Sequence, residues 1–478
     1  MPPKKKNNAP RFDRYARLWS RFFEPLILLL SLGKTRGEHF SGPRASSPMQ
    51  AVRRRVFDYI AYLCDYTKGG DSTSAIGLED CEDCYIFWIA SNQTSTKIVD
   101  FIEDILKDIK AFLILKSPRL EEAEKKFVHK CIRFASQRVN KEAKTLSNVF
   151  NRCIKHLEEQ SRPEDAKLLQ WLQAFDFDDY VALCERAYEQ RKAPEMKDLV
   201  ERSKTEHGES ENSDRAGTFD CARHLLGRLA HHVRAPKQIL EDAPNVPELS
   251  QRCFVRRIPL MKSVPAPEPD NLTKLESILK RMLPAKDPTL HRYQEALLNL
   301  DHRLGIQDRV IGQYKSPNFK PIVHAEIQVL EYFNQNNLRF VDDDRYISCS
   351  KPTCYCCHLY IRHHPLGIVE PASHQNIYPN WGLPLLSGIE DTKFPHQQNM
   401  LNKMLENIRR EALTQISRQT TADDHKESEH SDSDKSGHGS STSPDERSVE
   451  NIAEREDDSD SDTINGDGDS ERGGGAML

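Results

Sequence analysis

The sequence predicts an α/β fold that follows an α-helical region and precedes a disordered acidic tail. Three observations predict this organisation. Residues 48–200 carry apolar side chains at helical spacing in successive segments, and residues 319–361 alternate short extended runs with helix starts. Residues 419–478 are rich in Ser, Asp, Glu and Gly, so they cannot bury enough apolar surface to offset the entropy that ordering would remove.

Charge is distributed unevenly along the 478 residues. Residues 1–57 contain 13 lysines and arginines against 3 acidic residues, a net charge of +10. Residues 419–478 contain 5 against 18, a net charge of −13, so the total of −5 leaves −2 for the remainder. An enzyme that grips long nucleic acid usually has a basic body, and this nearly neutral body makes that function less expected.

The first 47 residues are predicted to form a basic arm with one apolar segment. Residues 11–32 have the pattern of an amphipathic helix with three arginines near one another. One interpretation is an arm that contacts a membrane surface or nucleic acid. The other is a terminus whose apolar part packs on the body of the protein. The run Phe22–Leu32 is interrupted by a glutamate and a proline and is too short to span a bilayer.

Twelve cysteines occur in a chain that shows no secretory signal. This combination predicts an intracellular protein, cytoplasmic or nuclear, in which the thiols are free or bind metal rather than form disulfides. No transmembrane segment is predicted.

Residues 48–200 are predicted to form a bundle in which each helix buries one face. The clearest stripe runs from Ile98 to Leu113, where apolar residues recur every three or four positions. This helical region is also the predicted contact surface for a protein partner. Cys81 and Cys84 form a C-x-x-C pair within it, which we interpret as incidental because no second pair lies nearby.

Residues 201–217 are polar and rich in Gly, Ser and Glu, and are predicted to be a linker. A second structured unit is predicted over residues 218–400, in which helical stripes flank a β-rich run at Cys253–Pro259. Residues 401–418 are predicted to add a C-terminal helix before the acidic tail.

A His-x-Glu motif and a Cys-x-x-Cys motif lie close together in this second unit. His324 follows a short extended run and begins a predicted helix, and Glu326 lies in its first turn. After a short predicted strand, Cys354 and Cys357 begin another helix. The N–H groups and the positive dipole end of a helix N-terminus favour thiolate over thiol.

The residue types predict a Zn²⁺ site. His324, Cys354 and Cys357 supply three of the four ligands of tetrahedral zinc and leave one position for water. Glu326 is placed to move protons without binding the metal. The order H-x-E followed by P-C-x-x-C is the arrangement of zinc-dependent nucleobase deaminases. The alternative is a closed structural site with a fourth protein ligand. Candidates for that ligand are Cys349, Cys356 and His358.

The helix that begins HAE, the stretch ISCSKPTCYCC and the downstream SHQNIYPNWGLP resemble a largely fungal family of predicted deaminases in the cytidine-deaminase-like superfamily. The resemblance covers residues 218–386. It implies an α/β/α sandwich around a mixed sheet of about five strands. It also implies zinc on His324, Cys354 and Cys357 with Glu326 as the proton shuttle. One departure is that Pro352 precedes the first cysteine by two positions rather than one.

These assignments predict hydrolytic deamination. Zinc lowers the pKa of its water toward about 7, and Glu326 passes the water proton to the ring nitrogen and the leaving amine. The substrate is a base, nucleoside, nucleotide or nucleic acid, and the sequence does not decide between a small molecule and a polymer. His374 and Trp381 are candidate contacts to the base, and packing against the sheet edge is the alternative for both.

Two other functions are compatible with the sequence. One is a non-catalytic interaction or scaffold protein whose deaminase-like zinc module is structural. The other is a transferred toxin or defence effector that acts by deamination. Glu326 favours catalysis, because a purely structural zinc site has no use for a proton carrier.

Overall fold

A mixed four-stranded sheet lies at the centre of the described part of the chain. The computed structural model describes residues 14–93, 96–116, 118–209, 217–316, 319–386 and 394–430. The strands are β1 (Ser74–Asp80), β2 (Tyr85–Ser91), β3 (Cys253–Arg257) and β4 (Ile347–Cys349). Their order is β3-β2-β1-β4, with β1 antiparallel to both neighbours and β2 parallel to β3. The predicted mixed sheet is confirmed, with four strands in the described residues rather than about five.

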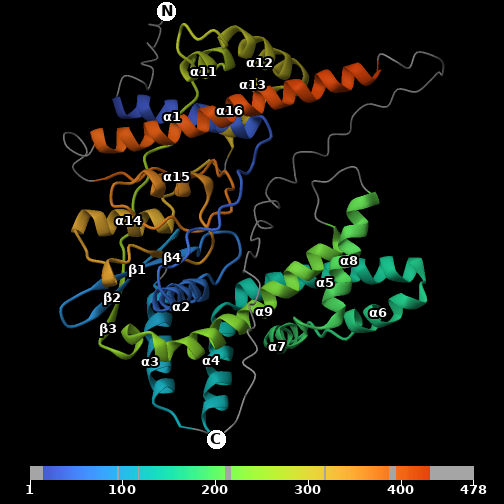
Figure 1. The fold of residues 1–478 in the computed structure, drawn as a ribbon, viewed down its shortest axis with the longest axis vertical. Coiled ribbons are helices and arrows are strands. Elements are labelled where there is room, and N and C mark those ends of the chain that lie inside the picture. The colour runs from blue at the N-terminus through green and yellow to red at the C-terminus, as the bar shows by residue number, and fades with distance from the viewer. Residues whose placement is uncertain are drawn as a thin grey trace, which may run out of the picture.

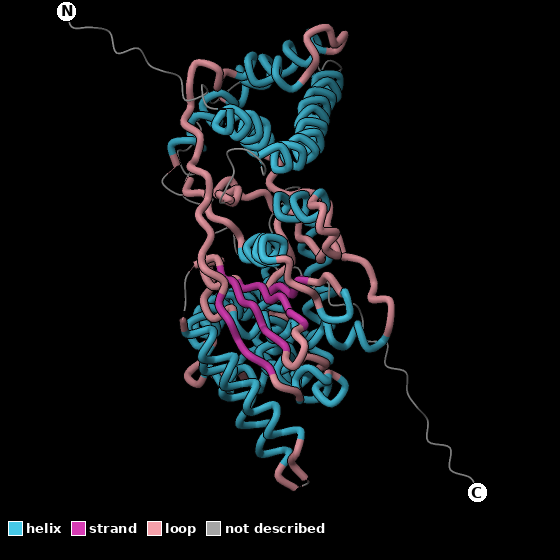
Figure 2. Tube along the Cα trace, turned by 90° about the vertical axis from the view of Figure 1, so that its left-hand side faces the viewer, coloured by secondary structure: helices cyan, strands magenta, loops and turns pink. Residues whose placement is uncertain are grey.

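Helices cover both faces of the sheet (Figures 1 and 2). On one face lies α14 (Ala325–Asn336), with α15 (Tyr355–His363) beside it. On the other face lie α2 (Pro48–Cys64) and α3 (Lys97–Leu113). Alternate residues of β1 therefore enter two different apolar clusters.

Close packing brings α14 directly onto β1. A Cβ atom added at Gly77 would lie 2.4 Å from Phe333 and 2.7 Å from Val329, so only glycine fits where the helix crosses the strand. This contact fixes the height of α14 above the sheet, and with it the position of the His324 backbone at the start of the helix.

A further layer of helices packs on the outer side of α14 and α15 (Figure 1). Its longest members are α1 and α16, which lie side by side. Its helices are α1 (Arg14–Ser31), α11 (Leu275–Met282), α12 (Leu290–Leu304), α13 (Ile306–Lys315) and α16 (Phe394–His430). The apolar side chains of α1 are buried in the same cluster as α14 and α15.

Six helices between residues 120 and 242 form a separate bundle. From here on, the helical region means these six helices and not the whole of residues 48–200. Its members are α4 (Leu120–Phe134), α5 (Ser136–Gln160), α6 (Ala166–Gln173), α7 (Tyr180–Gln190), α8 (Pro194–Glu209) and α9 (Thr218–Asp242). They share an apolar cluster of their own. The long helix α9 packs on α5 and α7 and also reaches α2, which joins the helical region to the layer under the sheet. Short helical turns complete the fold at η2 (Pro163–Asp165), η3 (Ala243–Asn245), α10 (Pro247–Ser250) and η4 (Val341–Asp343).

The prediction of a mainly helical region at residues 48–200 did not anticipate the strands at residues 74–91. These residues form the β1–β2 hairpin, which turns through Glu82 and Asp83 and pairs with β4 more than 250 positions later. Cys81 and Cys84 flank that turn, where the Cys81 backbone N–H donates to the Cys84 carbonyl at 3.0 Å. A two-residue turn between apolar runs is a hairpin signal, and helical periodicity in the neighbouring segments obscured it.

The ends of the chain also differ from expectation. Residues 14–31 form a buried helix rather than a free arm, so the interpretation in which the apolar part packs on the body is the one supported. The C-terminal helix runs over Phe394–His430 and not only over 401–418. The prediction of a linker at 201–217 is wrong for residues 201–209, which belong to α8. Parts of the predicted arm, linker and tail, at 1–13, 210–216 and 431–478, lie outside the described residues. No helix in the described ranges has the length and apolarity to cross a membrane.

Candidate metal centre

Two helix starts meet in the layer above the sheet. His324 is the residue immediately before α14, and Cys354 is the residue immediately before α15. Both have extended backbone conformations, which lets their side chains turn toward the gap between the helices. Cys357 follows in the first turn of α15 and faces the same gap.

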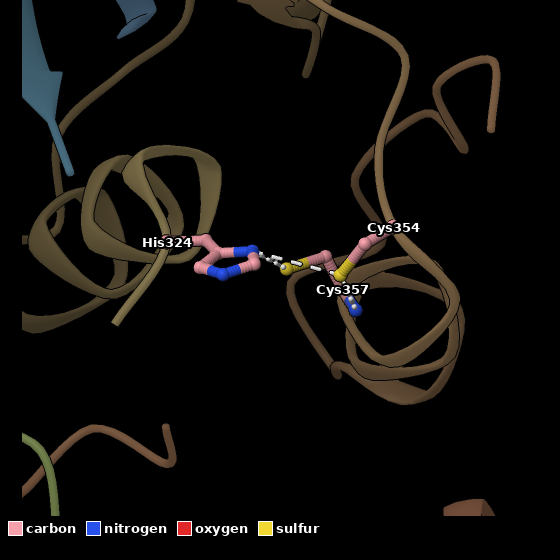
Figure 3. A group of neighbouring side chains, drawn as sticks. All are labelled: His324, Cys354 and Cys357. Atoms are coloured by element: carbon pink, nitrogen blue, oxygen red, sulfur yellow. Dashed lines mark hydrogen bonds between the residues drawn. The ribbon is translucent and has the colours of Figure 1, made fainter. Parts of the chain in front are cut away.

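The three side chains converge on a small volume (Figure 3). The Nδ1 atom of His324 lies 3.5 Å from the Cys354 sulfur and 3.3 Å from the Cys357 sulfur. All three donor atoms lie within 4.8 Å of one another. Each residue is buried: His324 is 8% exposed, Cys354 3% and Cys357 0%.

These separations fit a zinc ion. In tetrahedral zinc sites, Zn–N distances of about 2.0–2.1 Å and Zn–S distances of about 2.3 Å place the nitrogen and sulfur about 3.6 Å apart. The observed 3.3 and 3.5 Å between His324 and the two cysteines are close to that value. Imidazole with two sulfurs is also a donor set that suits zinc.

The two cysteines differ in their readiness to ionise. Burial opposes ionisation of Cys354, but the hydrogen bond with Cys357 and the charge of His324 outweigh it and hold the pKa of the Cys354 thiol well below its ordinary value. Burial raises the pKa of Cys357 well above its ordinary value, and the neighbouring Cys354 adds to that effect. The pair therefore carries one negative charge readily, and a bound cation is needed to favour the second.

The other two ionisable groups at the helix starts are shifted upward. Burial would lower the pKa of His324, but the negative Cys354 and Glu326 outweigh it and raise the pKa above its ordinary value. Burial raises the pKa of Glu326, against the opposing charge of His324. A carboxyl group shifted in this direction is better suited to both accepting and donating protons near neutral pH.

Glu326 lies in the first turn of α14 and is 5% exposed. Its carboxylate interacts with the Cys357 thiol by a hydrogen bond, which places it at the edge of the cluster. It is not among the three donors that gather within 4.8 Å. The structure thus brings all four residues of the two sequence motifs together, with the carboxylate beside the group of three donors rather than within it.

Trp381 contacts the cluster by its edge. The indole Nε1–H donates to the Cys357 sulfur at 3.2 Å. The residue is fully buried, and its ring packs near Phe22, at a centroid distance of 5.7 Å, and near Tyr360, at 6.0 Å. Protein side chains therefore surround the indole faces that the sequence suggested for stacking on a base.

His374 lies beside the second ligand helix. Its backbone N–H donates to the carbonyl of Thr353, the residue before Cys354, at 3.2 Å. Its ring is 5% exposed and stands edge-on to Tyr378 at 5.8 Å, and Tyr378 in turn stands edge-on to His324 at 6.2 Å. The half-buried Tyr378 therefore connects His374 with the metal ligands.

The residues that could have closed the site as a fourth ligand have other neighbours. The Cys349 thiol donates to the carbonyl of Ile347 at 3.6 Å. His358 pairs with Gln375 at 2.7 Å and with Glu370 at 3.1 Å. Within the described ranges, the only group of three or more potential metal donors is His324, Cys354 and Cys357, so Cys356 is not part of it.

Asn92 is a site residue that sequence reasoning missed. It follows β2, and its side-chain oxygen accepts the backbone N–H of Ala325, the residue between His324 and Glu326, at 2.9 Å. The two residues are 233 positions apart. Only recognition of the β1–β2 hairpin could have placed Asn92 near the site, because no local pattern marks it.

Comparison with known proteins supports a deaminase relationship for this site. The family model described as OTT_1508_deam-like deaminase matches residues 323–385. This segment begins just before His324 and ends after Trp381, so it includes both ligand-bearing helix starts. No curated protein and no solved structure matched the chain.

Proposed function

We propose that this protein is a zinc-dependent hydrolytic deaminase that acts on a nucleobase, nucleoside, nucleotide or nucleic acid. The observation that carries the proposal is the convergence of His324 Nδ1 with the sulfurs of Cys354 and Cys357, with the buried carboxyl of Glu326 at the edge. The matched deaminase family over residues 323–385 supports it independently.

His324, Cys354 and Cys357 would hold the zinc. Zinc in such a site supplies Lewis acidity that lowers the pKa of a coordinated water. Glu326 takes and returns protons, because its pKa is raised by burial and its position in the first turn of α14 places it at the edge of the ligand cluster. Trp381 stabilises the Cys357 thiolate through its N–H group.

The substrate ring is expected to lie against Tyr378, with His374 behind that ring. Tyr378 is the half-buried aromatic ring nearest His324, and His374 supports it from the other side. This arrangement suits a planar base that exposes an amino group to the metal ligands. In this proposal Trp381 acts on the ligand sulfur rather than on the substrate.

The three layers around the sheet are consistent with a cytidine-deaminase-like sandwich. In that interpretation α2 and the β1–β2 hairpin form the first part of the catalytic fold, and α14, β4 and α15 form the second. The helical region, which lies between α3 and β3 in the chain, is then an insertion into the catalytic fold.

The test is to measure metal content and turnover together in the full chain. Wild-type protein should hold one zinc per chain by elemental analysis and release ammonia from at least one member of a panel of cytosine and adenine nucleosides, nucleotides, single-stranded DNA and RNA. Glu326→Gln should keep zinc and lower turnover at least about 100-fold, because it removes the proton carrier and keeps the shape of the side chain.

Glu331→Gln provides the matched control. Glu331 is also buried on α14, but its carboxylate accepts from Tyr360 at 2.6 Å and is not part of the metal cluster. This variant should retain both zinc and turnover. Stoichiometric zinc with four protein ligands, and no ammonia from any substrate, would instead establish a structural module in a scaffold protein.

A further inference from the structure

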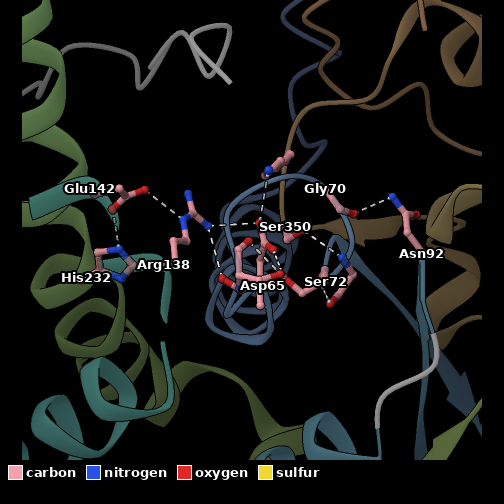
Figure 4. Close-up of polar contacts among 11 residues, drawn as sticks. Asp65, Gly70, Ser72, Asn92, Arg138, Glu142, His232 and Ser350 are labelled. Carbon is pink, nitrogen blue, oxygen red and sulfur yellow. Dashed lines mark hydrogen bonds and ion pairs between the residues drawn. The ribbon is translucent and has the colours of Figure 1, made fainter. Parts of the chain in front are cut away.

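A buried carboxylate links the helical region to the candidate site (Figure 4). Asp65 follows α2 and is 1% exposed. Its Oδ2 atom lies 3.1 Å from Arg138 and 3.5 Å from Lys351, and its Oδ1 atom accepts from Ser72 at 2.5 Å. One carboxylate therefore contacts a helix of the helical region, the segment before Cys354, and its own loop.

On one side, Asp65 is held by a chain of charges inside the helical region. Arg138, on α5, donates from Nε to Glu142 at 3.1 Å, and Glu142 contacts His232 of α9 at 3.0 Å. All three side chains are buried. Arg138 also lies over the Tyr62 ring at 5.0 Å, so its guanidinium is fixed in place.

On the other side, the same loop is tied to the segment that leads to Cys354. Lys351 is three residues before that ligand and faces Asp65. Ser350 accepts the N–H of Ser74 at 3.0 Å through its side chain, and its own N–H donates to the Ser74 carbonyl at 2.9 Å. Hydrogen bonds and an ion pair therefore join the segment from Ser350 to Cys354 to the loop that starts at Asp65.

The loop also reaches the histidine side of the site. Gly70 accepts the side-chain N–H of Asn92 at 2.9 Å, and the Asn92 backbone N–H donates to the Thr73 carbonyl at 3.0 Å. The Asn92 oxygen then accepts the N–H of Ala325, next to His324. Residues 65–74 thus contact the supports of both metal-ligating helix starts.

We infer that Arg138, Asp65 and Lys351 are positioning residues through which the helical region sets the separation of the two ligand helix starts. The inference rests on the proposed function for its catalytic meaning, but the contacts themselves do not depend on it. It assigns a role to the Ser350-Lys351 turn that precedes Pro352: Lys351 of this turn places a cation beside Asp65. Contacts made directly to metal ligands commonly alter metal affinity about 10–100-fold when removed, and the low end of that range is expected for these more distant residues.

The inference predicts that a change in the helical region loosens the metal. Arg138→Met removes the positive charge that pairs with Asp65 and keeps most of the side-chain length. In the full-length zinc protein it should speed zinc transfer to a chromogenic chelator about tenfold. With cobalt in place of zinc, the sulfur-to-cobalt absorption should shift or weaken, because that band reports ligand geometry.

Arg202→Met is the matched control. Arg202 also forms an ion pair in the helical region, with the buried Asp165, but it does not contact residues 65–74. It should lower thermal stability and leave the rate of zinc transfer unchanged. Equal acceleration in both variants would mean that general loosening of the helical region, and not the Asp65 contact, controls the metal.

Variants on the site side separate positioning from packing. Lys351→Met should speed zinc transfer as Arg138→Met does, whereas Lys351→Arg should restore the wild-type rate because it keeps the cation. In an Asp65→Asn background, Arg138→Met should have a much smaller or reversed effect, since its charged partner is gone. If the double variant changed the rate of zinc transfer by the product of the two single effects, Asp65 and Arg138 would act independently, and the inference would be overturned.

Amide hydrogen exchange distinguishes failure of this inference from failure of the proposed function. Without metal, Arg138→Met should still speed exchange at the Ala325 and Cys357 N–H groups relative to Arg202→Met. If wild type binds no zinc and this acceleration is present, the proposed function fails and the positioning link stands. If exchange at both groups matches the control, the positioning link is wrong whether or not the protein deaminates a base.

Discussion

The layer that carries the metal ligands and the helical region both have apolar cores, but their helices are built differently. In α14, eight of 12 residues are buried, including Glu326, Gln328 and Glu331. In α5, nine of 25 are buried, mostly apolar residues along one stripe. A helix that buries one face shows a regular pattern in the sequence. A helix enclosed on nearly all sides shows little pattern, and its buried polar residues must each find a partner.

Loss of a buried thiol gives the largest expected contrast between the layer that carries the metal ligands and the helical region. Cys354→Ala removes a metal ligand and should reduce zinc content to near zero with loss of turnover. Cys153→Ala, in α5, removes an equally buried thiol of the helical region and should cost only about 1 kcal/mol of packing while zinc stays bound. Elemental analysis and thermal unfolding measure the two effects. Loss of zinc from the Cys153 variant as well would mean that the regions unfold as one unit.

A second contrast tests how tightly α14 is held on the sheet. Gly77→Ala would place a methyl group 2.4 Å from Phe333, so α14 must shift and stability should fall by about 1–3 kcal/mol. Gly312→Ala, on the exposed side of α13, meets no atom within 4 Å and should stabilise its helix by about 0.5–1 kcal/mol. Denaturant unfolding and zinc content of both variants check this. An unchanged zinc site in Gly77→Ala would show that the position of α14 tolerates displacement.

The same contrast explains what could be predicted from the sequence. The apolar stripe at Ile98–Leu113 correctly predicted α3, and the strand expected at Cys253–Pro259 is β3. The metal motif was visible because its ligands are local to two helix starts. Spacing of residue types therefore identified the site chemistry, since each motif lies within one turn of helix.

Contacts between distant segments could not be predicted in this way. The β1–β2 hairpin pairs with β4 across the whole helical region, and strand pairing of that kind leaves no periodic signal. For the same reason neither Asn92 nor Asp65 could be placed near the site. Trp381 was singled out as an aromatic group near the ligands, but its orientation toward the Cys357 sulfur depends on α1 packing behind it.

Titration should distinguish the two regions by the sign of their pH dependence. Burial raises the pKa of Asp58, on α2 under the sheet and beside Tyr346, to about 7. Between its unfolded pKa of about 3.9 and pH 7, the folded state binds the extra proton, so this group makes stability fall as pH rises. Burial lowers the pKa of His231, in α9, to about 3. Between pH 3 and its unfolded value of about 6.5, the unfolded state binds the extra proton, so this group makes stability rise with pH.

The measurement is the free energy of unfolding at pH 5, 6 and 7 in wild type, Asp58→Asn and His231→Gln. Each group contributes a slope of at most about 1.4 kcal/mol per pH unit. Asp58→Asn should make the slope more positive, and His231→Gln should make it more negative. Slopes that change in the same direction in both variants would contradict the assigned protonation states.

The smallest expected effect concerns a single hydrogen bond to a ligand. Trp381→Phe keeps an aromatic ring among Phe22 and Tyr360 but removes the N–H group that donates to the Cys357 sulfur. A thiolate that loses such a donor loses an orienting contact, and zinc affinity should fall about tenfold. Trp19→Phe is the matched control, because its indole N–H donates to the Pro265 carbonyl at 2.9 Å in the same apolar cluster.

Competition with a chelator at several zinc concentrations measures the zinc affinity of each variant. Thermal unfolding measures the loss of packing separately from the loss of the hydrogen bond to the Cys357 sulfur. If Trp381→Phe and Trp19→Phe lose equal stability but only the first loses affinity, the indole N–H of Trp381 acts on the metal ligand. If both affinities fall together, the aromatic cluster holds α15 in place as a whole, and the edge contact at Cys357 adds nothing of its own. In that case the position of α15 depends on packing in the same way as the positions of helices in the helical region. The chemistry of the candidate site then rests on the three ligands and Glu326 alone.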